Sequence, residues 1–163
     1  MKQISRLLFL AISVFSSPYV LAADPALTIA ELNARIAKIG IPRVQGTDVV
    51  AGKTVPALFI GNRKINGNYD LVDTVRKDLG VVATVFVKDG DEFIRVSTNA
   101  MTPEGRRGVG TLLAHNKAYE ALSHGKSFCG VIDVLGTSLN SCYNPILNGA
   151  GQLIAASYVG HRT

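Results

Sequence analysis

Hydrophobic residues recur at helical spacing after residue 24 and again near residue 72, and from residue 81 they follow the spacing of β-strands. The first helix is predicted to begin at Asp24-Pro25 and to stop before Gly40, because proline suits a first turn and glycine ends helices. Two shorter helices are predicted over 70–79 and 115–124. Predicted strands cover 55–60, 81–87, 92–97, 127–134, 139–147 and 152–159.

The order of these elements predicts the class of fold. Helix, strand, helix, hairpin, helix and three consecutive strands lack the strand–helix–strand alternation of a parallel sheet. We therefore predict an α+β fold, with a central antiparallel sheet of about five strands, an N-terminal helix and short helices over the sheet. No repeat, low-complexity tract or linker divides the sequence, so residues 23–163 are expected to form one domain.

The N-terminal segment has the features of a secretory signal. Lys2 and Arg6 precede an apolar run over residues 7–14, and small residues end the segment at Ala22. A retained membrane anchor is the alternative, but Ser16, Ser17 and Pro18 leave the run short of the roughly 20 apolar residues that a spanning helix needs. We expect cleavage near Ala22 and a periplasmic or secreted protein without a membrane span.

Composition limits the function classes. Of the 163 residues, 47% are hydrophobic and 18% charged, which excludes a disordered chain. Without residues 1–22 the chain keeps 15 Lys and Arg against 12 Asp and Glu, a net charge of +3. Such a mildly basic balance is not typical of nucleic-acid-binding proteins, so no nucleic acid partner is expected.

Two cysteines are predicted to pair. In an oxidising compartment, two cysteines usually form a disulfide. If Val134 and Thr137 close the turn between the strands 127–134 and 139–147, Cys129 lies directly opposite Cys142. Two unpaired small residues are the alternative. The spacing fits no zinc or haem motif, so no metal is expected.

Arg95 is the strongest candidate for a binding residue. It interrupts an apolar strand in which Phe93, Arg95 and Ser97 are predicted on one side, with Ile94 and Val96 on the other. A buried guanidinium needs an anion, and it is well shaped to hold a carboxylate with two hydrogen bonds. Two roles remain open: a clamp on a ligand carboxylate, or an internal salt bridge to Asp73 or Asp133.

Five further residues are candidates for ligand contacts, each with a structural alternative. Thr98 and Asn99 either line the end of the Arg95 strand or cap the loop that follows. Arg107 is either a second cationic contact or a solvated loop residue. Asp133 is either a ligand hydrogen-bond acceptor or, more in keeping with its apolar strand, a buried partner of Arg95 or Arg107. Tyr143 is expected in the core or in a pocket wall.

No enzymatic constellation is present in the sequence. Neither a nucleophile beside a base nor a pair of catalytic carboxylates is recognisable, and His115, His124 and His161 have no triad or metal context. The sequence therefore predicts neither an enzyme nor a bound cofactor.

A series of short motifs matches the order found in one known family. They include Val55-Pro56, Leu71-Val72-Asp73, Ala83 to Val87, Gly90 to Asn99, Gly105 with Arg107, Gly130 to Gly136, Tyr143 with Pro145-Ile146, and Tyr158-Val159-Gly160. Over residues 52–160 the chain resembles single Cache sensor domains of the fused Cache 3/Cache 2 type. The resemblance implies a PAS-like fold whose pocket accepts small organic acids, as in the extracytoplasmic part of chemoreceptors and sensor kinases.

The chain also departs from that family pattern. Cys129-Gly130 and Ser138-Leu139 stand where the family usually has tyrosine-containing pairs, so the ligand preference of the family need not apply. No second membrane helix or signalling module is visible. We therefore expect a module that binds or presents a small organic acid, possible partners being a membrane receptor or sensor kinase in signal transduction or chemotaxis. The alternative is a ligand-free scaffold for protein interaction.

Overall fold

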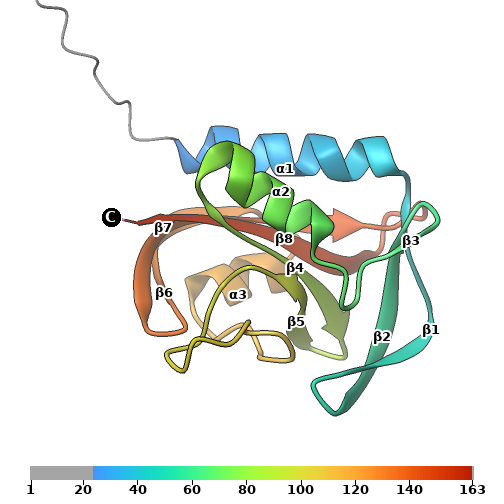
Figure 1. Cartoon of the computed structure of the whole chain (residues 1–163). Helices are drawn as coiled ribbons and strands as arrows, with labels where there is room; N and C mark the ends of the chain where they lie inside the picture. Colours follow the sequence, from blue (N-terminus) through green and yellow to red (C-terminus); the bar gives the residue numbers. More distant parts are fainter. Residues whose placement is uncertain (1–23, 163) are drawn as a thin grey trace, which may run out of the picture.

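The computed structural model describes residues 24–162, so the predicted signal segment 1–22 lies outside the described residues. Two antiparallel sheets and three helices make up this part of the chain (Figure 1). The helices are α1 (Pro25–Ile39), α2 (Asp70–Leu79) and α3 (Lys117–Ser123). The smaller sheet has the order β1-β2-β3, formed by Pro42–Val50, Lys53–Ile60 and Arg63–Lys64. The larger has the order β5-β4-β8-β7-β6, formed by Glu92–Thr98, Val82–Asp89, Leu153–Arg162, Thr137–Leu147 and Phe128–Val134.

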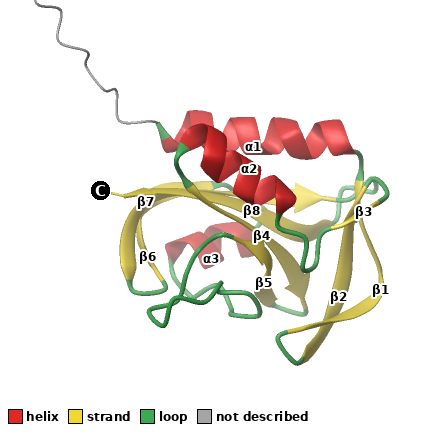
Figure 2. Ribbon diagram, viewed as in Figure 1, coloured by secondary structure: helices red, strands yellow, loops and turns green. Residues whose placement is uncertain are grey.

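The helices cover the two faces of the larger sheet unequally (Figure 2). Helices α1 and α2 pack on one face, where α1 contacts β7 and β8 and α2 contacts β4. Helix α3 lies on the opposite face against β6 and β7. The predicted α+β fold with a five-stranded central antiparallel sheet is thereby confirmed.

Helix α1 begins and ends as its sequence predicts. The Asp24 carboxylate accepts a hydrogen bond of 2.9 Å from the Ala26 amide, which caps the first turn. Ile29, Leu32 and Ile36 are buried at helical spacing. Gly40 follows with a φ of 146°, and a Cβ atom there would lie 2.7 Å from the Gly61 Cα, so a side chain has no room.

Strand β1 was not predicted, because its sequence carries no alternation of apolar and polar residues. Most of its side chains are exposed. The register with β2 shifts between Val44 and Thr47, where Gly46 adopts a positive φ of 70°. The strand therefore depends on backbone pairing with β2 rather than on an apolar face.

A β-bulge in β5 decides which side chains share a face. Val85 of β4 lies opposite Ser97, whereas Phe86 lies opposite Arg95, so Val96 is an extra residue. Ser97 consequently points toward the α1/α2 side, where its hydroxyl donates a 2.6 Å hydrogen bond to the Asn68 carbonyl. The prediction that Arg95 and Ser97 share one face was wrong, because a strict alternation ignores the bulge.

Two apolar cores result, one on each face of the larger sheet. The core on the α1/α2 side contains Ile29, Val72, Val85 and Val96 among its buried residues. The core on the α3 side, called here the α3-side core, consists of Phe86, Phe93, Leu113, Ala118, Leu122, Ile132, Val134, Leu139, Tyr143, Ala156 and Tyr158. Ile132, Val134, Leu139 and Tyr143 thus share the predicted buried face of the β6–β7 hairpin.

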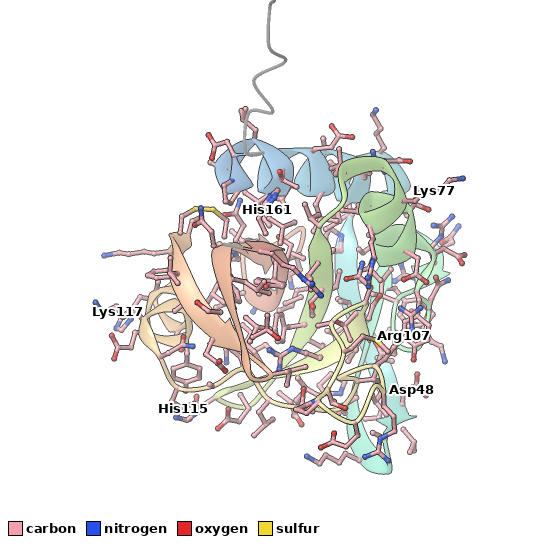
Figure 3. All side chains as sticks on the ribbon, turned by 60° about the vertical axis from the view of Figure 1, so that its left-hand side comes forward. Asp48, Lys77, Arg107, His115, Lys117 and His161 are labelled. Carbon is pink, nitrogen blue, oxygen red and sulfur yellow. A yellow bond between two sulfur atoms is a disulfide. The ribbon has the colours of Figure 1, made fainter. Side chains whose placement is uncertain are left out.

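The β6–β7 hairpin has the predicted register. Val134 pairs with Thr137, and Cys129 lies directly opposite Cys142. The two cysteines form a disulfide, visible as a yellow bond in Figure 3. Cys142 is buried in the core of the α1/α2 side, and Cys129 is exposed. Within residues 24–162, β7 is the only strand paired with the edge strand β6, and the disulfide ties the two strands together.

Candidate functional site

Arg95 lies inside the protein, on the α3 side of the larger sheet. Its side chain is only 3% exposed, and within residues 24–162 it is the only charged residue that is buried. Its guanidinium Cζ lies 4.9 Å from the centroid of the Phe86 ring, the residue opposite it on β4. Such a stacking contact stabilises a cation, but it does not supply a negative charge.

Only some of the hydrogen-bond donors of the Arg95 guanidinium have partners. Nη1 donates to Thr111 Oγ1 at 3.0 Å and to the Leu112 carbonyl at 2.7 Å. Nε is fully buried and has no hydrogen-bond partner in the described part of the chain. Burial lowers the pKa of the Arg95 guanidinium, although an arginine remains charged in proteins. The site therefore holds a buried positive charge with a free donor.

The predicted salt bridge of Arg95 is not formed. Asp73 binds Arg107 instead, and Asp133 is exposed. Within residues 24–162, the ion pairs of the structure do not include Arg95. The internal ion pair, one of the two roles left open by the sequence, is thus excluded for these residues.

Two tyrosines complete the surroundings of Arg95. The rings of Tyr143 and Tyr158 lie 4.6 Å apart, and Phe86 lies 6.4 Å from Tyr143, measured between ring centroids. The Tyr143 hydroxyl is buried without a hydrogen-bond partner among the described residues. Burial raises the pKa of Tyr143 above its usual range and that of Tyr158 to about 12, so both phenols are neutral near pH 7. Neither offers a negative charge to Arg95.

Small residues on β7 and β8 make room for Tyr158. A Cβ atom at Gly160 would lie 2.0 Å from the Tyr158 hydroxyl oxygen, so the phenol occupies the space above this glycine. Ser141, which pairs with Gly160 across the strands, donates a long hydrogen bond of 3.5 Å to the same hydroxyl. Phe86, Ser141 and Thr111 were not predicted as site residues. Phe86 and Ser141 could have been found only from the β4–β5 and β7–β8 registers, and Thr111 only from the path of the loop after β5. The sequence defines none of these.

Thr98 and Asn99 are engaged in the fold. The hydroxyls of Thr98 and Thr84 lie 2.6 Å apart on neighbouring strands. The Asn99 side chain accepts from the Ala83 amide at 2.8 Å and donates to the Val72 carbonyl at 2.6 Å. Asn99 therefore joins β4, β5 and α2, which agrees with the structural alternative of the sequence analysis.

Replacing Asn99 with alanine is expected to lower the free energy of unfolding by about 2 kcal/mol, because two buried backbone groups lose their partners. Urea denaturation of the mature protein measures this change. Asn140→Ala is the matched control, since Asn140 is exposed on β7, and it should shift stability by less than about 0.5 kcal/mol. Equal effects of the two substitutions would contradict the structural role of Asn99.

Arg107 is held by the protein itself. Its Nη1 and Nη2 donate to the two Asp73 carboxylate oxygens at 2.7 and 2.8 Å, and Nη1 also donates to the Thr98 carbonyl at 2.9 Å. Its Cζ lies 4.6 Å from the centroid of the Tyr69 ring. These contacts fasten the loop after β5 to α2, on the flank of the molecule labelled in Figure 3. Arg107 is thus held by Asp73 and the Thr98 carbonyl, while 35% of its side chain stays exposed.

Asp133 lies on the outer face of the edge strand β6, together with the exposed Cys129 and Val131. Its carboxylate accepts a 3.0 Å hydrogen bond from the Gly136 amide in the hairpin turn. The prediction of a buried partner for Arg95 or Arg107 was wrong, because this face of the edge strand is exposed to solvent.

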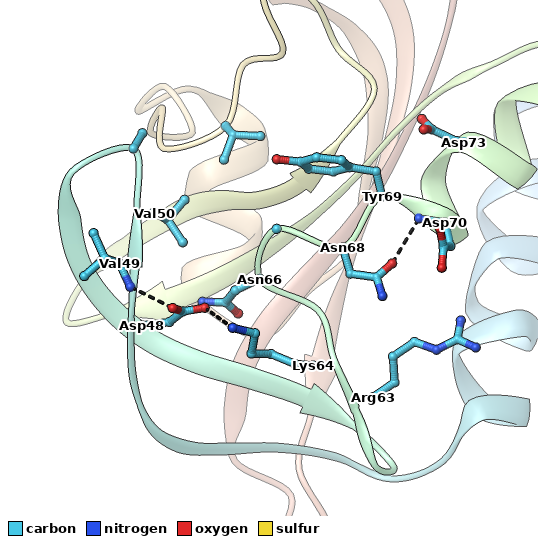
Figure 4. A pocket seen from close by; sticks show the side chains of 13 residues that line it. Asp48, Val49, Val50, Arg63, Lys64, Asn66, Asn68, Tyr69, Asp70 and Asp73 are labelled. Carbon is cyan, nitrogen blue, oxygen red and sulfur yellow. Dashed lines mark hydrogen bonds and ion pairs between the residues drawn. The ribbon is translucent and has the colours of Figure 1, made fainter.

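Three cavities are lined by other parts of the chain. The first, of about 910 Å³, lies between the β1–β2 hairpin and residues 66–73, where Asp48 binds Lys64 and Asn68 accepts from the Asp70 amide (Figure 4). The second, of about 410 Å³, borders the α3-side core at Val82, Val134 and Leu139. The third, also about 410 Å³, lies beside α2 and Arg107. Arg95 lines none of these three.

Within residues 24–162, no group of three or more His, Cys, Asp or Glu side chains is placed to hold a metal ion. No helix in the same range is both long and apolar enough to cross a membrane.

An antiparallel five-stranded sheet with helices on both faces defines a PAS-like α+β fold of the kind found in sensor domains. The family model of the Cache 3/Cache 2 fusion domain matches residues 30–163, and the chain belongs to this family. Cache domains of this kind are extracellular or periplasmic sensor domains that bind small ligands.

The similarity of this chain to individual known proteins is weak. Among solved structures, the crystal structure of the Escherichia coli DcuS sensor domain is similar, with a TM-score of 0.43 and 14% identity. The similarity covers 56% of this chain and 63% of that one, so less than two thirds of the DcuS chain is matched. No curated protein matches.

Proposed function

We propose that the mature protein is a periplasmic sensor module that binds a small organic acid, with Arg95 holding the carboxylate of the ligand. The observation that carries this proposal is the burial of Arg95 without an anionic partner in residues 24–162. Taking a charge out of water is costly unless it is paired. A ligand carboxylate would supply the missing charge and an acceptor for the free Nε donor.

The proposed contact residues are fewer than the sequence suggests. Arg95 and Tyr143 each have an unsatisfied buried donor on the α3 side. We keep Thr98 as a third proposed contact, because it lies on the same face of the sheet, opposite Thr84. Asn99, Arg107 and Asp133 have their side chains bound elsewhere, so we assign them no direct role in the proposed site.

We further propose that the liganded module acts through a membrane receptor or sensor kinase, as in signal transduction or chemotaxis. Support comes from the family, whose members are extracytoplasmic sensor domains. The predicted signal segment supports export to the compartment in which such receptors present their sensor domains.

A thermal-shift screen of the oxidised mature protein against short carboxylates tests the proposed site. A ligand at 100 times its Kd should add about 2.7 kcal/mol to the free energy of unfolding. The shift is expected to disappear in Arg95→Met and to persist in Arg63→Met, a matched substitution of an exposed arginine. A shift that survives Arg95→Met would place the ligand elsewhere.

A ligand-free interaction scaffold is the second candidate. The observation that favours it is that Arg95 lines none of the three cavities, while Tyr158 fills the space above Gly160. In that case no carboxylate would shift the unfolding temperature of the wild-type protein.

A further inference from the structure

The second cavity, of about 410 Å³, lies at one end of the larger sheet, and Arg95 does not line it. It forms where β4 begins and β8 ends, since Val82 and Gly160 are paired there. Helix α1 begins at the same end of the molecule, where Thr28 Oγ1 lies 3.1 Å from His161 Nε2 (Figure 1). Sites for small molecules usually have volumes of about 300–1,000 Å³, and this cavity falls in that range.

The charged residues that line the second cavity are all cationic. Arg76 belongs to the last turns of α2 and Arg162 to the end of β8, and no aspartate or glutamate of residues 24–162 lines the cavity with them. His161 is also in the wall, but burial lowers the pKa of its imidazole, so the ring is mostly neutral near pH 7. The cavity therefore has two positive charges and no negative one.

Neither arginine is neutralised by a carboxylate in the described part of the chain, because the ion pairs there involve other cations. Arg76 Nη1 donates a 3.3 Å hydrogen bond to the Asn99 carbonyl, which is a neutral acceptor. Asp73, one turn before Arg76 on α2, is bound by both terminal nitrogens of Arg107. Positive charges that gather in a concave surface without acids attract anions to it.

The buried part of the cavity wall is apolar. Val134 and Leu139 belong to the α3-side core and also line the cavity. Met101 lines it as well and is 45% exposed, so its flexible apolar side chain is free to cover a ligand. A ligand that carries only charge would leave this apolar surface in contact with water.

From these charges and this wall, we infer that the second cavity binds a phosphate monoester with a short apolar body. A phosphate monoester has close to two negative charges near neutral pH and three terminal oxygens, which guanidinium groups bind in pairs. Arg76 and Arg162 hold the phosphate from α2 and from β8, and the apolar body packs against Val134 and Leu139. A monocarboxylate has a single charge and balances only one of the two arginines. This site is separate from the one proposed at Arg95 and does not depend on it.

Three probes separate the effect of charge from that of the apolar body. Butyl phosphate and butyl sulfate have the same shape, but at pH 8 the phosphate ester has about two charges and the sulfate ester one. Methyl phosphate keeps the charge and lacks three methylene groups. In isothermal titration of the oxidised mature protein, we expect butyl phosphate to bind about tenfold more tightly than either of the other two.

Substitutions of the two arginines locate the site. Arg76→Met and Arg162→Met should each weaken the binding of butyl phosphate by about tenfold or more. Both residues are exposed, so their replacement should not disturb the fold. Arg63→Met, a matched change of an exposed arginine on β3, should leave the Kd unchanged. Equal affinity in all three variants, or equal affinity of the wild-type protein for butyl phosphate and butyl sulfate, would overturn the inference.

A soluble ester and the headgroup of a lipid are two sources of the same phosphate chemistry. Flotation with phosphatidylcholine vesicles, with and without phosphatidic acid, distinguishes them. Flotation that requires phosphatidic acid and is lost in Arg162→Met would assign the site to a lipid headgroup, whereas binding of butyl phosphate without flotation would assign it to a soluble ester. Absence of both butyl phosphate binding and flotation would overturn the inference and leave the proposal for Arg95 untouched.

Discussion

Replacing Arg95 with methionine is expected to make the ligand-free protein more stable, raising the free energy of unfolding by about 1–4 kcal/mol. The guanidinium is 3% exposed, has no carboxylate partner in residues 24–162 and keeps a free Nε donor. Methionine removes this unpaired charge and fills an irregular space beside Phe86 with a flexible apolar chain. The gain is reduced by the loss of the hydrogen bonds to Thr111 and the Leu112 carbonyl.

Urea denaturation of the mature protein without ligand measures this gain, with Arg63→Met as the control. Arg63 is exposed on β3, so its substitution should change the free energy of unfolding by less than about 0.5 kcal/mol. A marked loss of stability in Arg95→Met would mean that the protein already satisfies the charge. The argument for a ligand anion would then lose its basis.

A gain in stability together with a loss of ligand binding would identify Arg95 as a functional residue rather than a structural one. Residues kept for binding often cost stability in the free protein, because the group awaiting the ligand is unsatisfied. Substitution of a structural residue has the opposite effect, as expected for Asn99, whose side chain joins two buried backbone groups. The two substitutions on one strand and its following loop therefore change stability in opposite directions.

The order of the elements could be predicted from the sequence because the larger sheet has apolar faces. Its strands and the three helices carry clear apolar periods, and short turns define the hairpins. Strand β1 has no such period, because most of its side chains are exposed and only backbone pairing with β2 defines it. Exposed strands of this kind leave little trace in the pattern of hydrophobicity.

The sequence predicts the central residue of the candidate site, Arg95, but not the residues around it. Arg95 stands out because a charge interrupts an apolar strand. The bulge at Val96 turns the Ser97 side chain to the opposite face of the sheet from the predicted one, and no residue type in the strand indicates a bulge. Asp133 interrupts a strand in the same way as Arg95, and β5 and β6 are the two edge strands of the sheet. The side chains of β5 are buried on both faces, whereas the face of β6 that carries Asp133 is exposed. The same local pattern thus has opposite outcomes on a covered and on an uncovered face of an edge strand.

Opening the disulfide by the substitution Cys129→Ala is expected to lower the free energy of unfolding by about 3 kcal/mol, the effect of a cross-link that closes a loop of about 15 residues. The separation of Cys129 and Cys142 is 13 residues. Cys129 is the residue to replace because it is exposed, whereas Cys142 is part of the buried core and its loss would also create a cavity. The loss in Cys129→Ala therefore reports the cross-link rather than packing.

Chemical denaturation with and without a thiol reductant provides the internal control. Reduced wild-type protein should match Cys129→Ala, and the reductant should leave Cys129→Ala unchanged. Equal stability of oxidised and reduced wild-type protein would show that the β6–β7 pairing holds without the cross-link. The expected loss matters for the site as well, because β6 has no other strand neighbour in the described part of the chain and supplies Ile132 and Val134 to the α3-side core. Loosening this edge would disturb the apolar core on the side of the sheet where Arg95 lies.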